Sequence, residues 1–450
     1  MFLVTFFKGF MFLSILSSIK SFFSFSDCPE VTRKRFFYLG FAAFAIMFAQ
    51  WPIKVLKDGL LISEVGADNK PWARAFSVVL CFLLSLGYGQ LVSKMRRENV
   101  IYFLTGILSL IGFVFFVLIS LYMQKYNFPF AKEYVVYGFY TYVDVFIVLT
   151  LPTFWAFVND ISLPTEAKRA YGFLAFMAQA GGLVAVLLGK WILGEDSSSN
   201  SSFVLLASLI AIIVYAFSIF FMVQDLGHKN LKGYDGDHKP TQEKHKVPFL
   251  KGLALIATSP YVLGIMVLTA SQEILTAVMQ FRMDKTVEAA FILDKTGLNK
   301  YIFDYAVWIQ VVSCTFSFLG SFFQAHFGTE ICILIYPVIL GICFGATAFF
   351  PSLMIVSAMQ ALIKGLHYAL NKPSRETLYI PTTKEVKYKS KSWIDSFGSR
   401  LFKLMGAFIN KNLYGSVGVV VSGVLLLWIP MAHYVGKKYK DSVKNNETIT

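Results

Sequence analysis

The sequence predicts an all-α integral membrane protein with twelve transmembrane helices in two bundles of six. Three observations carry this prediction. The 450 residues are 56% hydrophobic and only 15% charged, whereas a soluble protein of this length carries roughly a quarter charged residues. Twelve apolar runs are long enough to cross a hydrocarbon core of about 30 Å. A polar stretch divides these runs into two groups of six.

The apolar runs follow one another with short loops between them. The first group covers residues 36–57, 73–93, 99–123, 134–158, 170–193 and 203–224. The second group covers residues 252–280, 302–325, 331–350, 351–370, 394–411 and 413–434. Between them lies "QDLGHKNLKGYDGDHKPTQEKHKVP", whose charges, Gly and Pro cannot be buried. We therefore expect an N-terminal bundle at 36–224, a cytoplasmic central loop at 225–251, a C-terminal bundle at 252–434 and a cytoplasmic tail at 435–450.

Residues 1–35 are expected to form a cytoplasmic or interfacial segment before the first span. The stretch "MFLVTFFKGFMFLSILSSIKSFFSFS" is rich in Phe and Ser, and its only charges are Lys8 and Lys20. A cleaved signal peptide is the alternative, but no small-residue cleavage site follows cleanly. A retained segment is favoured because a Phe-rich helix with sparse lysines suits the headgroup boundary.

The basic loops predict the orientation of the chain, because Lys and Arg in short loops prefer the cytoplasm. The stretches "TRKR", "KMRR", "EAKR", "KEVKYKSK" and "GKKYK" and the central loop all fall on one side under a count of twelve spans. Both termini should therefore be cytoplasmic. The loop "GEDSSSNSS" has acids and no base and suits the other side; its match to a glycosylation sequon is read as chance. This organisation is typical of major-facilitator-like transporters, although channels and membrane enzymes stay open on composition alone.

Composition and motifs argue against several other classes of protein. The net charge is +14, but the basic residues sit in loops and not in an aromatic-interleaved patch that would bind nucleic acid. The five cysteines contain no CxxC pair. His228, His238 and His245 are irregularly spaced, so a solvated linker is favoured over a metal clip. P-loop, HExxH and GxSxG motifs are lacking, and we expect neither an enzyme with catalytic residues nor a metal or other cofactor.

Ionisable residues inside the apolar runs are the candidate functional residues. Counted from Phe36 at 1.5 Å per residue, Lys54 lies about 27 Å along the first span and Lys57 near its far boundary. Lys54, Lys57 and Asp58 are three and four residues apart, so they share one helical side. Snorkelling of the lysines to the interface is one interpretation. A charged stripe that faces an aqueous cavity is the other.

Further buried charges favour the second interpretation. Asp144 lies near the middle of the fourth run, and Glu273 lies inside the seventh. Arg400 and Lys403 are three apart on an otherwise apolar helix. Each would cost several kcal/mol if it faced lipid, so all should face the interior. Four helices that contribute charges of both signs indicate a path for a solute.

Three segments resemble the nucleotide transporters, the ATP:ADP antiporters of plastids and obligate intracellular bacteria. "KVLKDGLLISEVGAD" is similar to the family's first-helix motif, and "FYTYVDVFIVLTLPTFWAFVNDISLPTEAKRAYGFLA" to its fourth helix and the loop that follows. "ALNKPSRETLYIPTTKEVKYKSKSWIDSFGSRLFK" resembles its most recognisable segment, a Tyr-Ile-Pro run followed by Lys, Asp, Gly, Arg and Lys. The matches occur in order and cover most of the chain.

The resemblance implies which residues meet the substrate. Carried over by motif, the family's substrate-critical charges fall on Lys57, Asp144, Glu273 and Lys403, with Lys54 and Arg400 as supports. The chain departs from the family at three positions. It has Asp144 where glutamate is usual, Lys54 where arginine is common, and Ala277 where the family commonly has lysine.

The implied function is exchange of nucleotides, ATP and ADP or another nucleoside triphosphate, by alternating access. Lysines would clamp the phosphates while the two acids pair with those lysines in the empty site. Aromatic side chains such as Tyr137, Tyr140 and Trp155 are expected to pack and not to stack on the base. We expect a monomer in the lipid bilayer, in a bacterial inner membrane. Proton-coupled net import of nucleotides or another phosphorylated anion, and a non-transporting receptor or scaffold, are the alternatives.

Overall fold

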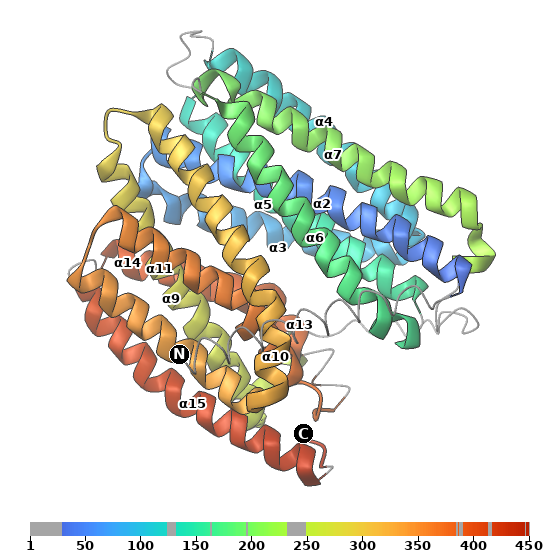
Figure 1. The fold of residues 1–450 in the computed structure, drawn as a ribbon, viewed down its shortest axis with the longest axis vertical. Coiled ribbons are helices and arrows are strands. Elements are labelled where there is room, and N and C mark those ends of the chain that lie inside the picture. The colour runs from blue at the N-terminus through green and yellow to red at the C-terminus, as the bar shows by residue number, and fades with distance from the viewer. Residues whose placement is uncertain are drawn as a thin grey trace, which may run out of the picture. The chain divides into compact units, whose positions relative to one another are not determined.

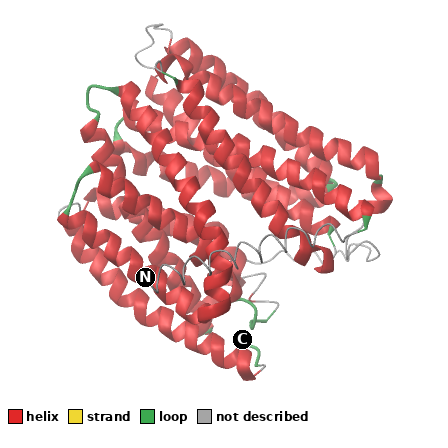
Figure 2. Cartoon of the chain, in the orientation of Figure 1, coloured by secondary structure: helices red, strands yellow, loops and turns green. Residues whose placement is uncertain are grey.

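The computed structural model describes residues 29–123, 132–162, 164–194, 197–231, 249–383, 386, 390–412, 416–445 and 447–449. Within these ranges every named element is a helix, as Figure 2 shows, apart from an isolated bridge between Thr382 and Ile449. The helices divide into two compact units. Unit 1 comprises residues 1–242 and 291–310, and unit 2 comprises residues 243–290 and 311–450.

Unit 1 is built from six long helices and the first part of a seventh (Figure 1). The six are α2 (Glu30–Glu64), α3 (Lys70–Lys94), α4 (Arg97–Met123), α5 (Lys132–Ile161), α6 (Pro164–Leu193) and α7 (Ser197–Leu226). Two short 3-10 helices, η1 (Ala67–Asn69) and η2 (His228–Leu231), follow α2 and α7.

Helix α2 is the core of unit 1, because it packs against α5, α6 and α7. Its contact with α6 is close enough to require glycine. A Cβ on Gly181 would lie 2.9 Å from the backbone carbon atoms of Phe44. The hydrophobic effect does not hold helices together inside a bilayer, so close van der Waals packing at small residues such as this one stabilises their association.

Unit 2 contains the remaining helices. They are α8 (Phe249–Thr258), α9 (Pro260–Ala290), the later part of α10 (Lys295–Phe349), α11 (Leu353–Leu366), α12 (Lys372–Thr377), α13 (Lys391–Trp393), α14 (Ser399–Asn412) and α15 (Val417–Asn445). Two π-helical turns, η3 (His367–Asn371) and η5 (Ile394–Gly398), precede α12 and α14. The core gathers around α9, with Tyr261, Tyr336 and Trp428 among its largest fully buried side chains.

Helix α10 belongs to both units and consists of two helices. The break is at Gly328, whose φ of 75° and ψ of 161° are not helical. The division between the units falls earlier than this break, because residues 295–310 of α10 group with unit 1. Asp304 forms an ion pair with Lys190, and Lys295 donates to Glu64 at 2.9 Å. This segment therefore groups with helices that precede it by more than a hundred residues.

Within the described ranges, helical segments lie in each of the twelve apolar runs expected from the sequence. Among the described residues, eight helices are long and apolar enough to cross a membrane. Exposed Leu, Ile, Val and Phe side chains are numerous on these helices, as a lipid-facing surface requires. The all-α membrane fold is confirmed, while the count of twelve spans stays a prediction. The N-terminal 28 residues and most of the central loop lie outside the described residues.

Candidate functional site

Lys57 and Asp144 form an ion pair inside unit 1. Lys57 lies on α2 and its side chain is 7% exposed, while Asp144 lies on α5 and its side chain is 25% exposed. A lysine buried to this degree requires a partner, because removing an ammonium from water costs several kcal/mol. Two of the charges that the sequence singled out in this half of the chain, Lys57 and Asp144, are therefore brought together.

Two further side chains complete this group. The Ser77 hydroxyl on α3 donates to the second carboxylate oxygen of Asp144 at 2.5 Å. The Lys57 ammonium lies 4.1 Å from the centre of the Tyr140 ring, in a cation–π contact. We call Lys57, Ser77, Tyr140 and Asp144 the Lys57 cluster. Three helices hold it, and the less buried Asp144 is its more accessible charge.

A tight turn after α2 gives Asp58 a different partner. Gly66 has a φ of 94°, a conformation that glycine adopts without strain, and α3 begins four residues later. This turn brings Lys70 back to Asp58, where their ion pair measures 3.0 Å. Lys70 is 3% exposed. Asp58 is thus engaged by Lys70, and the ammonium of Lys57 lies against Asp144.

Lys54 lies outside the Lys57 cluster. Its ammonium is 4.5 Å from the centre of the Trp51 ring, and the residue is half-buried. The aromatic residues that the sequence analysis considered have packing roles. Tyr140 is buried under Lys57, and Trp155 contacts Phe154 edge to face. Tyr140 therefore cannot stack on a ligand in this structure.

The Lys57 cluster is electrostatically balanced. An ammonium and a carboxylate cancel each other, and Ser77 and Tyr140 stabilise one charge each. A phosphate that approached the ammonium would replace the carboxylate with another anion and would leave Asp144 bonded to Ser77. The Lys57 ammonium is therefore the one positive charge among the four side chains, and Asp144 is its anionic partner.

In unit 2 the candidate residues lie on two helices that touch. Glu273 is half-buried on α9, and α14 carries half-buried Arg400 and exposed Lys403. Helix α14 meets α9 at Gly406, where a Cβ would lie 2.6 Å from the carbonyl oxygen of Ile274. Glu273 adjoins Ile274, and Lys403 precedes Gly406 by three residues. Glu273 and Lys403 thus lie within about a turn of the same helix crossing, and Arg400 lies three residues before Lys403 on α14.

Sequence reasoning missed a buried arginine in unit 2. Arg375 on α12 is 9% exposed and donates to the side chain of Gln272, the neighbour of Glu273, at 3.0 Å. The adjacent Glu376 forms an ion pair with Lys391 at 2.5 Å. The signal was present, because Arg375 lies in the segment "NKPSRETLYIP" that carried the family resemblance.

In the part of the chain that the structure describes, no group of three or more His, Cys, Asp or Glu side chains is placed to hold a metal ion. Of the three histidines considered for a metal clip, His238 and His245 lie outside the described residues. His228 lies 3.8 Å from Glu98. The described site is therefore made of charged, hydroxyl and aromatic side chains only.

Comparison with protein families gives one match that spans nearly the whole chain. Residues 23–439 match the TLC ATP/ADP transporter family. ADP,ATP carrier protein 1 of Rickettsia typhi is 22% identical, over 92% of this chain and 95% of the relative. ADP,ATP carrier protein 4 of Rickettsia bellii is 23% identical, over 91% of each chain.

Solved structures share the fold at low sequence identity. A bacterial homologue of the iron transporter ferroportin in an inward-facing state matches with a TM-score of 0.62 and 14% identity, over 92% of this chain and 99% of that one. The D-xylose-proton symporter matches with a TM-score of 0.59 and 11% identity, over 90% and 96%. These similarities confirm the major-facilitator-like fold that the two groups of six apolar runs predicted.

Proposed function

The chain belongs to the TLC ATP/ADP transporter family, and we propose that it exchanges nucleotides across a membrane by alternating access. Relatives that match over nine-tenths of its length are named ADP,ATP carrier proteins. ATP and ADP, or another nucleoside triphosphate, are the proposed substrates. The protein is a multi-pass membrane carrier, and the proposed cycle makes and breaks no covalent bond.

The Lys57–Asp144 pair is the observation that carries this proposal. A nucleoside triphosphate carries up to four negative charges, and ammonium groups bind phosphate through short charge-assisted hydrogen bonds. In the proposed empty state, the Asp144 carboxylate occupies the place that a phosphate oxygen takes when the nucleotide binds. The Lys57 ammonium is already removed from water in that state, so binding of the phosphate adds no further desolvation cost for this group.

The other members of the cluster support an exchange of partners. When Lys57 turns to the phosphate, Asp144 keeps the hydrogen bond from Ser77, so the carboxylate is not left without a donor. Tyr140 keeps its contact with the Lys57 ammonium. The bound and empty states thus differ in one charge pair, which favours rapid release and return of nucleotide.

We extend the proposal to the charged residues of unit 2. Glu273, Arg400 and Lys403 repeat the combination of an acid with bases, and α9 and α14 pack tightly beside them. We propose that Lys403 contacts the nucleotide phosphates, that Arg400 supports it, and that Glu273 balances these bases in the empty state. Lys54, held over Trp51, is proposed as a second base near the entry of the anion.

The remaining parts of the proposal concern topology and assembly. Both termini and the central loop 225–251 lie in the cytoplasm, because the basic loops gather on that side. Along the sequence, the proposed bundles are residues 36–224 and 252–434. The terminal segments 1–35 and 435–450 lie outside them. The carrier works as a monomer in a bacterial inner membrane.

Uptake of labelled nucleotide tests the proposal directly. Cells that express the chain should accumulate labelled ATP, and unlabelled nucleoside triphosphates should compete far better than adenosine, since phosphate charge dominates binding. Competition by adenosine at the same concentration would refute the phosphate clamp. A receptor or scaffold would take up no label.

Exchange and proton-coupled import differ in what they need. An exchanger needs nucleotide inside and ignores a proton uncoupler. Uptake into nucleotide-free vesicles that an uncoupler abolishes would instead support a proton-coupled importer, in which Asp144 or Glu273 carries the proton.

A further inference from the structure

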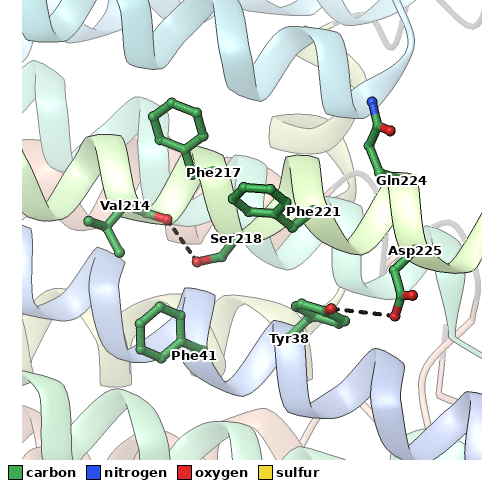
Figure 3. A pocket seen from close by; sticks show the side chains of 8 residues that line it. All are labelled: Tyr38, Phe41, Val214, Phe217, Ser218, Phe221, Gln224 and Asp225. Carbon is green, nitrogen blue, oxygen red and sulfur yellow. Dashed lines mark hydrogen bonds between the residues drawn. The ribbon is translucent and has the colours of Figure 1, made fainter.

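A groove between α2 and α7 lies apart from the Lys57 cluster. It has a volume of about 580 Å³. Its walls are aromatic, and Phe41, Phe217 and Phe221 remain 46%, 53% and 56% exposed. Figure 3 shows Phe41 on α2 and Phe217 and Phe221 on α7 among the side chains that line it. The proposed nucleotide exchange uses none of these residues.

The groove has the length of one lipid leaflet. Both α2 and α7 are long and apolar enough to cross a membrane. On α7 the lining runs from Val214 to Asp225, one residue before the helix ends. Eleven residues at 1.5 Å each extend about 16 Å, and half of a hydrocarbon core measures about 15 Å. An apolar chain in the groove would thus reach from the membrane boundary to the middle of the bilayer.

The end of the groove at Tyr38 and Asp225 is polar and carries one carboxylate. Tyr38 donates its hydroxyl to the Asp225 carboxylate at 3.4 Å (Figure 3), and Gln224 is a further polar residue of the lining. The exposed carboxylate has room for a further donor. One turn before Tyr38 on the same face of α2 lies Lys34, whose ammonium is 54% exposed and 3.3 Å from Glu30. The Asp225 carboxylate and, one turn away, the Lys34–Glu30 pair therefore mark the end where a lipid headgroup would lie.

We infer that this groove binds one phospholipid with a primary amine headgroup, such as phosphatidylethanolamine. Its acyl chain packs against Phe41, Phe217 and Phe221. Its ammonium donates to Asp225, and its phosphate lies near Lys34. A quaternary choline cannot donate a hydrogen bond to the carboxylate, and a glycerol headgroup brings no positive charge to it.

Lipid retention by the purified, full-length chain tests the inference. The chain is reconstituted in vesicles with equal parts of phosphatidylethanolamine, phosphatidylcholine and phosphatidylglycerol that share the same acyl chains. It is extracted in a mild detergent, and bound lipid is counted by native mass spectrometry. The wild type should retain phosphatidylethanolamine above the other two lipids. Asp225→Asn should lower this retention about two- to fivefold, as loss of an exposed charge pair implies.

Matched variants separate the groove from general effects. Val214→Trp fills the groove and should abolish retention, whereas Val114→Trp puts the same bulk on an exposed position of α4 and should not. Asp441→Asn removes an exposed acid from α15 and should also leave retention unchanged. Every variant is first required to elute from gel filtration as the wild type does.

Three results would overturn the inference. One is equal retention of the three lipids by the wild type, and another is wild-type retention by Asp225→Asn and Val214→Trp. The third concerns the occupant. A photoreactive phenylalanine at position 217 should become linked to lipid in membranes. Linkage to a second copy of the chain, or to residues 1–28 of its own chain, would show that protein and not lipid fills the groove.

Discussion

Neutralising the Lys57–Asp144 pair one residue at a time and then together should separate folding from transport. Lys57→Gln leaves the half-buried Asp144 carboxylate with Ser77 as a donor but without its counter-charge. Asp144→Asn leaves the buried ammonium with an amide oxygen and the Tyr140 ring but without a counter-charge in the cluster. In the double variant both groups are neutral amides, which can hydrogen-bond to each other. Each single variant should therefore be less stable than the double variant.

The size of the effect follows from burial. Removing one partner of a fully buried pair costs about 3–5 kcal/mol. Because a quarter of the Asp144 side chain is exposed, solvent reduces this, and we expect about 1–3 kcal/mol for each single variant. Loss of one charge-assisted hydrogen bond to phosphate is worth about 1.5–3 kcal/mol, or roughly 10- to 100-fold in nucleotide affinity.

Two assays measure these effects separately. Thermal unfolding in detergent should rank the wild type and the double variant above both single variants. Uptake of labelled ATP, normalised to the amount of protein at the cell surface, should fall in all variants that lack Lys57. Lys57→Arg should keep a larger part of the uptake than Lys57→Gln, because it keeps the positive charge.

A control variant and two contrary results define the test. Lys440→Gln breaks an exposed ion pair with Glu330 and should leave stability and uptake near those of the wild type. Wild-type uptake by Lys57→Gln would refute the role of this lysine. Additive losses of stability in the double variant would contradict the pairing of Lys57 with Asp144.

Three further predictions concern other parts of the chain. Ser77→Ala should slow nucleotide turnover while leaving the surface amount near that of the wild type, because Asp144 loses its second donor; unchanged turnover would contradict this role. Gly406→Ala should destabilise the protein by about 1–3 kcal/mol, because the added Cβ meets the backbone of α9. Gly423→Ala has open space around it and should leave stability unchanged, so equal unfolding midpoints for the two variants would refute the close packing. Reporter fusions at Asp237 and Ser198 should report opposite sides of the membrane, and the same side for both would break the topology.

Much of the fold and part of the site could be predicted from sequence. The apolar runs locate the helices because lipid demands about twenty apolar residues for each span. The same demand singles out Lys57 and Asp144, since an ionisable residue inside such a run needs a partner. The structure pairs Lys57 with Asp144, a contact between residues 87 positions apart that sequence spacing alone does not predict.

The parts that could not be predicted depend on tertiary contacts. Helical spacing places Lys54 and Asp58 on one side, but the turn at Gly66 brings Lys70 to Asp58. The hydrogen bond between Arg375 and Gln272 links segments 103 residues apart. The grouping of residues 291–310 with unit 1 likewise follows from packing, which hydropathy does not encode.

Counter-exchange by the purified chain in vesicles tests the central claim most directly. Vesicles loaded with ADP and matched empty vesicles are given labelled ATP outside, with and without a proton uncoupler. The account predicts rapid uptake only into loaded vesicles, unaffected by the uncoupler and lost in Lys57→Gln. Equal uptake into empty and loaded vesicles, or full exchange by Lys57→Gln, would contradict it.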